Sequence, residues 1–191
     1  MKRFSGTPLF HLAFAAASLL IHYWMLHTGM YGMETAADVY KPFMGALPDG
    51  GENPFAAGPL VFAFYEFFSS LFDEPLTAFH AGSAILAATF TYAVLRLAFR
   101  LGSPAWLLLL IGLWSLISPL VHWMTLSHPH ILLGTVFLFL LFLSLRNNNY
   151  LLVIIFLVHL VLTHHIIAVA AGVLTATSLI RSPGLKKTSF F

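Results

Sequence analysis

The charged residues of this chain separate into two groups when its long apolar stretches are read as membrane-crossing helices. All seven carboxylates then lie on one side, and all of the nine lysines and arginines except Lys41 lie on the other. Membrane proteins retain basic residues in their cytoplasmic loops, so the pattern predicts the topology. The acidic side is extracytoplasmic, and both chain ends are cytoplasmic. The acidic residues are Glu34, Asp38, Asp49, Glu52, Glu66, Asp73 and Glu74.

The composition supports an integral membrane protein. Hydrophobic residues make up 59% of the 191 residues and charged residues only 8%, whereas soluble domains carry about 25% charged residues. The net charge of +2 is small and confined to the predicted cytoplasmic turns, so we expect no nucleic-acid partner. The chain has no cysteine, which excludes disulfides and thiolate metal sites.

The apolar stretches predict an all-α bundle of about six spans, built as a single domain over residues 1–181 with a cytoplasmic tail at 182–191. The first stretch exceeds the roughly 7–15 residues of a cleavable signal core, so we expect it to be retained. A break at Thr163-His164-His165 predicts two short helices at the end of the bundle, and one long tilted helix is the alternative. The predicted spans are 8–27, 75–100, 104–122, 128–145 and the divided stretch 150–180.

Residues 28–77 are predicted to form a long extracytoplasmic loop that ends in an interfacial or re-entrant helix. The apolar and aromatic part of this loop, Gly58 to Phe72, is short and interrupted by Glu66, which is typical of a helix in the membrane interface. The alternative is a true span. That span would place Arg96 and Arg100 outside, and the charge rule disfavours it.

The histidines share the acidic side. Of the ten histidines, all except His11 fall in the predicted outer half or outer loops, although ionisable groups inside spans are costly and usually face a cavity or a partner. Ser127-His128-Pro129-His130 opens a predicted helix, whose N-terminus would favour a phosphate. The alternative is a capped interfacial helix without a ligand.

Two carboxylates stand near the start of the outer loop. Glu34 or Asp38 could act as a general base on a hydroxyl acceptor or could ligate a divalent ion. A solvated acidic loop is the alternative.

Several segments resemble the polyprenyl-phosphate-dependent GT-C membrane glycosyltransferases. Asp38-x-Tyr40, Gly50-Gly51-Glu52-Asn53-Pro54-Phe55 and Gly58-Pro59-Leu60 resemble the first outer loop of that superfamily. The passage from Ile117 to Arg146 is similar to a later one, with His128-Pro129-His130 where the family often carries Gly-Gln-x-Asn or Pro-Asp. The chain departs from the family in being shorter and in lacking an outward Arg or Lys cluster.

The resemblance implies transfer of a sugar from a polyprenyl-phosphate donor to an acceptor at the extracytoplasmic membrane face. Asp38 would be the catalytic base, and Glu34 its substitute or a ligand for a divalent cation, Mg²⁺ or Mn²⁺. Further metal candidates are His164 and His165. Residues expected to bind the lipid phosphate or substrate are Lys41, Tyr40, His128, His130, His164 and His165.

Two other function classes stay open. The first is a non-catalytic small subunit or scaffold, in which a partner membrane protein supplies missing helices. The second is a His-rich membrane metalloprotein holding iron or zinc, which His159 and the pair His164-His165 favour, although the His-x-x-x-His spacing of diiron enzymes is absent. Membrane lipid is an expected partner in all three classes.

Overall fold

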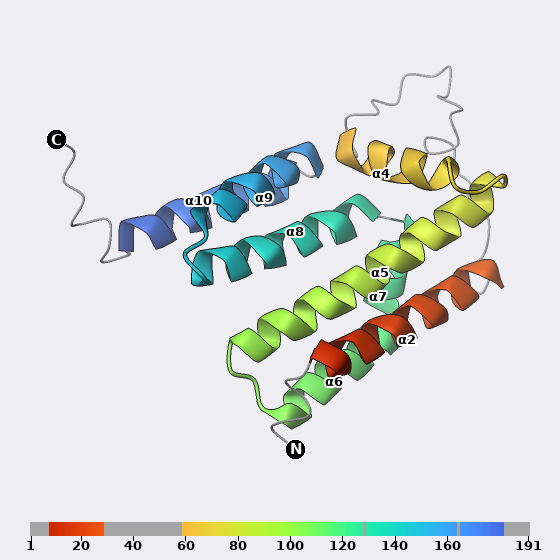
Figure 1. The fold of residues 1–191 in the computed structure, drawn as a ribbon, viewed down its shortest axis with the longest axis horizontal. Coiled ribbons are helices and arrows are strands. Elements are labelled where there is room, and N and C mark those ends of the chain that lie inside the picture. The colour runs from red at the N-terminus through yellow and green to blue at the C-terminus, as the bar shows by residue number, and fades with distance from the viewer. Residues whose placement is uncertain (1–7, 29–58, 128, 164, 182–191) are drawn as a thin grey trace.

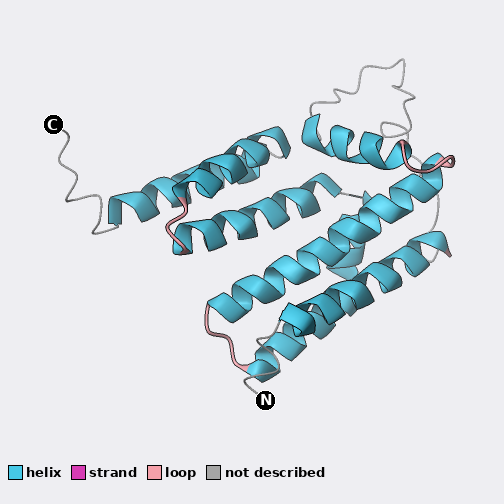
Figure 2. Cartoon of the chain, viewed as in Figure 1, coloured by secondary structure: helices cyan, strands magenta, loops and turns pink. Residues whose placement is uncertain are grey.

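The computed structural model describes residues 8–28, 59–127, 129–163 and 165–181. These residues form eight α-helices and no strand (Figures 1 and 2), which confirms the all-α prediction. The helices are α2 (Pro8–His27), α4 (Pro59–Ser69), α5 (Pro75–Arg100), α6 (Ala105–Ile117), α7 (Pro119–Ser127), α8 (Pro129–Arg146), α9 (Tyr150–Thr163) and α10 (His165–Arg181).

Within this described part, two helices are long and apolar enough to cross a membrane, namely Pro8–His27 and Leu76–Arg100. A third candidate is the bent pair Ala105–Ile117 and Pro119–Thr125, if the pair counts as one span. The later apolar helices are shorter, so length and composition alone support two or three spans of the predicted six.

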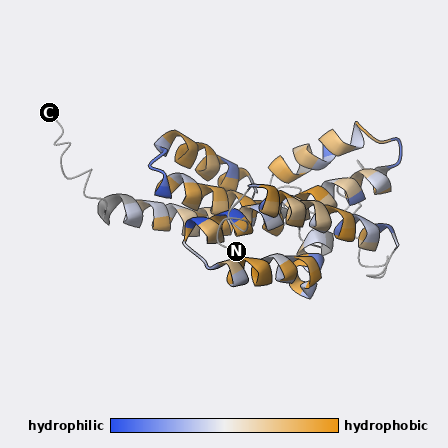
Figure 3. Cartoon of the chain, turned by 60° about the horizontal axis from the view of Figure 1, so that its bottom comes forward, coloured by the Kyte–Doolittle hydropathy of each residue, from blue (hydrophilic) through white to orange (hydrophobic). Residues whose placement is uncertain are grey.

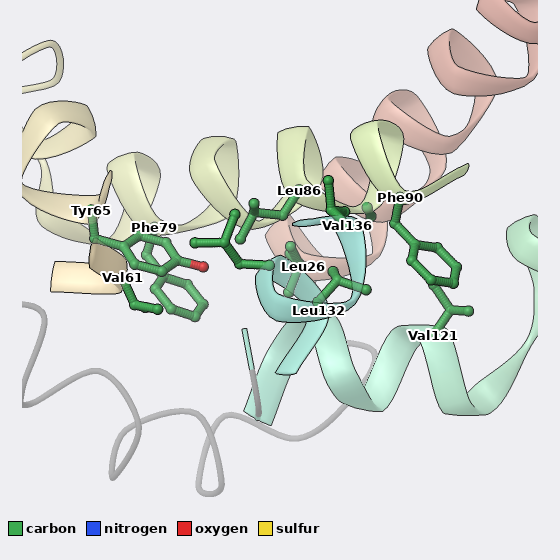
Figure 4. Close-up of a cluster of buried hydrophobic side chains, with 11 residues drawn as sticks. Leu26, Val61, Tyr65, Phe79, Leu86, Phe90, Val121, Leu132 and Val136 are labelled. Atoms are coloured by element: carbon green, nitrogen blue, oxygen red, sulfur yellow. The ribbon is translucent and has the colours of Figure 1, made fainter. Parts of the chain in front are cut away.

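Helix α5 is the centre of the bundle. It has 26 residues, about 39 Å at 1.5 Å per residue, and it contacts α2, α4, α6, α7 and α8. Helix α8 in turn contacts α9 and α10 (Figure 1). The main hydrophobic cluster joins five helices around α5 and α8 (Figure 4). Its buried members are Leu26, Val61, Tyr65, Phe79, Leu86, Ala87, Phe90, Val121, Leu132, Leu133 and Val136.

Many large hydrophobic side chains are exposed on the outside of the bundle. Hydrophobic residues predominate along most of the helices, and hydrophilic residues concentrate near the turns (Figure 3). Trp24 is exposed near the end of α2 and Trp106 at the start of α6, whereas Trp114 and Trp123 are exposed on the two sides of the break between α6 and α7. Tryptophan is enriched at both membrane–water interfaces, and the positions of Trp24 and Trp106 at helix ends fit that preference.

The predicted continuous span 104–122, with a turn at Met124–Ser127, is wrong in detail. The helix breaks at Ser118, and α6 and α7 are bent by 52° relative to each other. The following Pro119 explains the break, because proline lacks the N–H of a helical hydrogen bond and its ring clashes with the carbonyl four residues earlier. Ser118 itself is extended, with φ −68° and ψ 120°, as residues before proline prefer. Helix α7 then continues through the expected turn to Ser127.

Helix α4 is the short helix expected at the end of the long loop. Its 11 residues rise about 16 Å, too little to cross a membrane of about 30 Å. One face of α4 packs tightly on α5, where a Cβ added at Gly82 would lie 3.0 Å from the Tyr65 ring. The Tyr65 and Ser83 hydroxyls form a buried hydrogen bond of 2.7 Å, so α4 is fixed to the bundle.

The predicted break in the last apolar stretch is confirmed. Helix α9 ends at Thr163 and α10 begins at His165, and the two helices pack against each other as a hairpin (Figure 1). The alternative of one long tilted helix is therefore wrong. Their shared cluster with α8 consists of Leu141, Val153, Leu160, Ala168 and Ala171.

Candidate functional site

The residues predicted from the sequence to form the site fall mostly outside the described residues. Glu34, Asp38, Tyr40 and Lys41 belong to the segment 29–58, and His128 and His164 also lie outside the described ranges. The backbones of His130 and His165 lie in the first turns of α8 and α10, but their side chains are not described. The structure therefore does not test the predicted roles of these eight residues or the metal candidates among them.

The helix ends that flank these residues point toward the same side of the bundle. In Figure 1 the facing ends of α9 and α10 lie near the top centre, the start of α8 lies below α4, and the C-terminal end of α2 lies at the right. The C-terminal ends of α5, α8 and α10 lie at the opposite end. Those three helices finish with Arg100, Arg146 and Arg181. The described helix ends that flank the predicted site segments therefore lie apart from these three arginines.

A pair of buried histidines lies between α2 and α7. The rings of His22 and His122 have centroids 4.5 Å apart and planes tilted by 45°. The two side chains are almost fully enclosed, with 1% and 5% of their surfaces exposed. His22 stands five residues before the end of α2, which places it about 7 Å along the helix from that end.

Hydroxyl groups connect His22 to α5. The Nδ1 atom of His22 lies 2.8 Å from the backbone oxygen of Ser18 and 3.2 Å from its hydroxyl oxygen. Thr91 of α5 donates a hydrogen bond of 3.0 Å to the same hydroxyl oxygen. Ser18 and Thr91 are both fully buried, so this polar network lies inside the helix interface.

A second histidine pair lies nearer the end of the bundle. His27, at the end of α2, meets the buried His80 of α5 edge to face, with ring centroids 6.3 Å apart. Tyr23 stacks on His27 with centroids 5.9 Å apart. The exposed Glu74 precedes α5 and accepts a hydrogen bond of 2.7 Å from Thr77. Two histidine pairs thus line the contacts of α2 with α5 and α7.

These pairs were not predicted as pairs from the sequence. The signal was present in α2, whose buried residues are His11, Ser18, His22 and Leu26. Spacings of seven and four residues place these four buried side chains on one face of α2, and three of them are polar. No group of three or more His, Asp or Glu side chains in the described ranges could hold a metal ion.

No protein-family model, curated protein or solved structure matches this chain. The function is therefore inferred from the site residues and from the way the fold arranges them.

Proposed function

We propose that this protein transfers a sugar from a polyprenyl-phosphate donor to an acceptor at the extracytoplasmic face of a membrane. The observation that carries the proposal is the common side of the bundle on which α2, α4, α7, α8, α9 and α10 begin or finish next to the predicted site segments (Figure 1). This arrangement supports the proposal, because segments that are far apart in the sequence leave the bundle on the same side.

The proposed topology has six spans and cytoplasmic termini. Helices α6 and α7 form one bent span, α8 forms another, and the α9–α10 hairpin supplies the last two. Helix α9 has 14 residues and α10 has 17, or about 21 and 26 Å. Short spans are accommodated by local thinning of the bilayer at modest cost. The arginines that end α5, α8 and α10 support a cytoplasmic assignment for the opposite end.

The proposed chemistry follows from the residue types of the predicted site segments. Asp38 takes the proton of the acceptor hydroxyl as that oxygen attacks the sugar. The bond between the sugar and the phosphate oxygen breaks, and polyprenyl phosphate leaves; Glu34 would hold a divalent Mg²⁺ or Mn²⁺ ion, which would supply positive charge for that phosphate. Lys41, Tyr40 and the imidazoles of His128, His130, His164 and His165 donate hydrogen bonds to the phosphate oxygens, and the free N–H groups of the first turn of α8 favour the same negative charge.

Sugar transfer by the purified chain tests the proposal. The chain is reconstituted in liposomes with a panel of radiolabelled polyprenyl-phosphate hexoses, and transfer to water-soluble acceptors is measured. We expect Asp38→Asn to abolish transfer while expression and helicity stay normal. Glu66→Gln is the matched control, because Glu66 is an exposed carboxylate on α4 at the same end, and this variant should keep full activity.

Two outcomes would contradict the proposal. A fully active Asp38→Asn variant removes Asp38 from the catalytic role. Absence of transfer with every donor, together with a membrane partner that co-purifies in fixed ratio, would instead identify a non-catalytic subunit.

A further inference from the structure

The hydrogen bonds of His22 fix which of its ring nitrogens carries a proton. A carbonyl oxygen can only accept, so the 2.8 Å contact between Nδ1 and the Ser18 backbone oxygen requires the proton on Nδ1. The neutral ring then has a lone pair on Nε2, and this buried atom has no hydrogen-bond partner among the described residues. A second proton on His22 would therefore be placed on Nε2, inside the helix contact.

A second imidazole faces His22 across that contact. The His122 ring lies 4.5 Å from the His22 ring, measured between centroids, and both side chains are buried. The other polar groups facing His22 are uncharged, namely the Ser18 hydroxyl and, beyond it, Thr91 of α5. No carboxylate in the described ranges acts on His22. Protonation of both rings would therefore set two like charges close together, where little water screens them.

The second histidine pair involves the same helix. The ring of His27 on α2 meets the ring of the buried His80 on α5, with centroids 6.3 Å apart, and Tyr23 stacks on His27. The charge of the exposed Glu74, which precedes α5, acts on His80. This carboxylate offsets part of the repulsion between two protonated rings. Both pairs thus lie along the C-terminal part of α2, one facing α7 and the other facing α5.

We propose that the two histidine pairs form an acid-sensitive contact, which releases the C-terminal part of α2 from α5 and α7 when the rings are protonated. In the closed arrangement the added charges are enclosed and repel each other, whereas in an open arrangement water reaches the rings and screens them. The open arrangement therefore binds protons more readily, and acid favours it by linkage. The contact is retained at neutral pH and lost as the pH falls.

The part of α2 that would move adjoins a predicted site segment. Helix α2 ends at His27, and residues 29–58 follow closely along the chain. Release of α2 would displace the point at which that segment begins. The inference concerns only the contact between helices, so it does not depend on the proposed sugar transfer.

Distances between spin labels test the proposal. The chain has no native cysteine, so labels can be placed at Leu20→Cys on α2 and Val161→Cys on α9, whose side chains are 69% and 63% exposed. The full chain in lipid nanodiscs is measured by pulsed electron paramagnetic resonance from about pH 7.5 down to about pH 4.5, a range that contains the usual titration of imidazole. We expect the distance distribution to shift and broaden as the pH falls, and to recover on return to neutral pH.

Glutamine variants identify the groups responsible, because glutamine stays neutral and can still donate a hydrogen bond. The double variant His22→Gln, His80→Gln removes one imidazole from each pair, so its distance change should need a pH at least about one unit lower than in wild type. Glu74→Gln removes the charge that offsets the repulsion, so its change should occur at higher pH than in wild type. Where circular dichroism shows that the double variant does not fold, the single variants His22→Gln and His122→Gln replace it.

His159→Gln is the matched control. His159 is a half-buried histidine in α9 whose Nδ1 also bonds a backbone oxygen, that of Ile155 at 2.7 Å. Its ring contacts Phe137 and not a second histidine. This variant should respond to acid as wild type does.

Three results would overturn the proposal. The first is a wild-type distance distribution that is the same at both ends of the pH range. The second is a change that does not reverse at neutral pH, which would indicate acid unfolding. The third is a change with the same midpoint in wild type and in the folded glutamine variants of the pairs, which would assign the response to other groups.

Discussion

Removal of the Tyr65 hydroxyl should loosen α4 from the bundle by a measurable amount. Tyr65→Phe keeps the ring and its stacking on Phe79, with centroids 5.0 Å apart, and deletes the 2.7 Å hydrogen bond to Ser83. Both partners are buried, with 2% and 0% of their surfaces exposed. A buried hydrogen bond contributes about 0.5–1.5 kcal/mol, and bonds between transmembrane helices average about 0.6 kcal/mol. We therefore expect a loss of about 1 kcal/mol.

Ser83→Ala should cost a similar amount, about 0.5–1.5 kcal/mol, because it removes the same buried hydrogen bond. A double-mutant cycle isolates the interaction free energy between the Tyr65 and Ser83 hydroxyls from their contacts with other residues. The double variant should be less destabilised than the sum of the singles by about 1 kcal/mol, or roughly 2–4 °C in Tm for a chain of this size. Thermal unfolding in detergent measures the four proteins. Tyr150→Phe, at an exposed tyrosine, should be neutral. Additive effects of the two single substitutions would refute the claim that this bond fixes α4 to α5.

Two further predictions concern the helices that carry the site. Pro119→Ala restores a backbone N–H and removes the ring clash, so the bend between α6 and α7 should straighten. The distance between spin labels placed on exposed positions of the two helices should then lengthen. An unchanged distance would mean that the proline does not cause the 52° bend. Leu141→Ala opens a cavity beside α9 and α10, because Leu141 is 1% exposed, and should cost about 2–5 kcal/mol. Leu151→Ala, at a side chain 69% exposed, should change the unfolding temperature little. If Leu141→Ala and Leu151→Ala lowered the unfolding temperature equally, the packing of the α9–α10 hairpin on α8 would be contradicted.

The helix pattern was largely predictable because apolar length and proline position are local properties. The starts of α5 at Pro75 and α8 at Pro129 follow from the preference of proline for the first turn of a helix. The division at Thr163-His164-His165 followed from a stretch too long for one span. The break at Ser118 interrupts the predicted continuous span: Pro119 signals the break, but the apolar character of the sequence continues across it.

The histidine pairs could not be predicted, because they depend on contacts between helices. His22 and His122 are far apart in the sequence, and their rings come together only because α2 and α7 both pack against α5 and α6. The sequence shows that α2 carries His11, Ser18 and His22 on one face, but not which helix that face meets. The burial of Tyr65 against Ser83 has the same origin, since α4 appeared from its composition to be an interfacial helix only.

The two-sided topology is the central claim, and cysteine accessibility tests it most directly. The chain has no native cysteine, so single substitutions need no background correction. Asp49→Cys lies in the predicted outer loop, and Asn147→Cys lies in the exposed turn between α8 and α9. A membrane-impermeant thiol reagent should label Asp49→Cys in intact cells, and Asn147→Cys only after permeabilisation. Labelling of both positions from the same compartment would contradict the topology, and the proposed site with it.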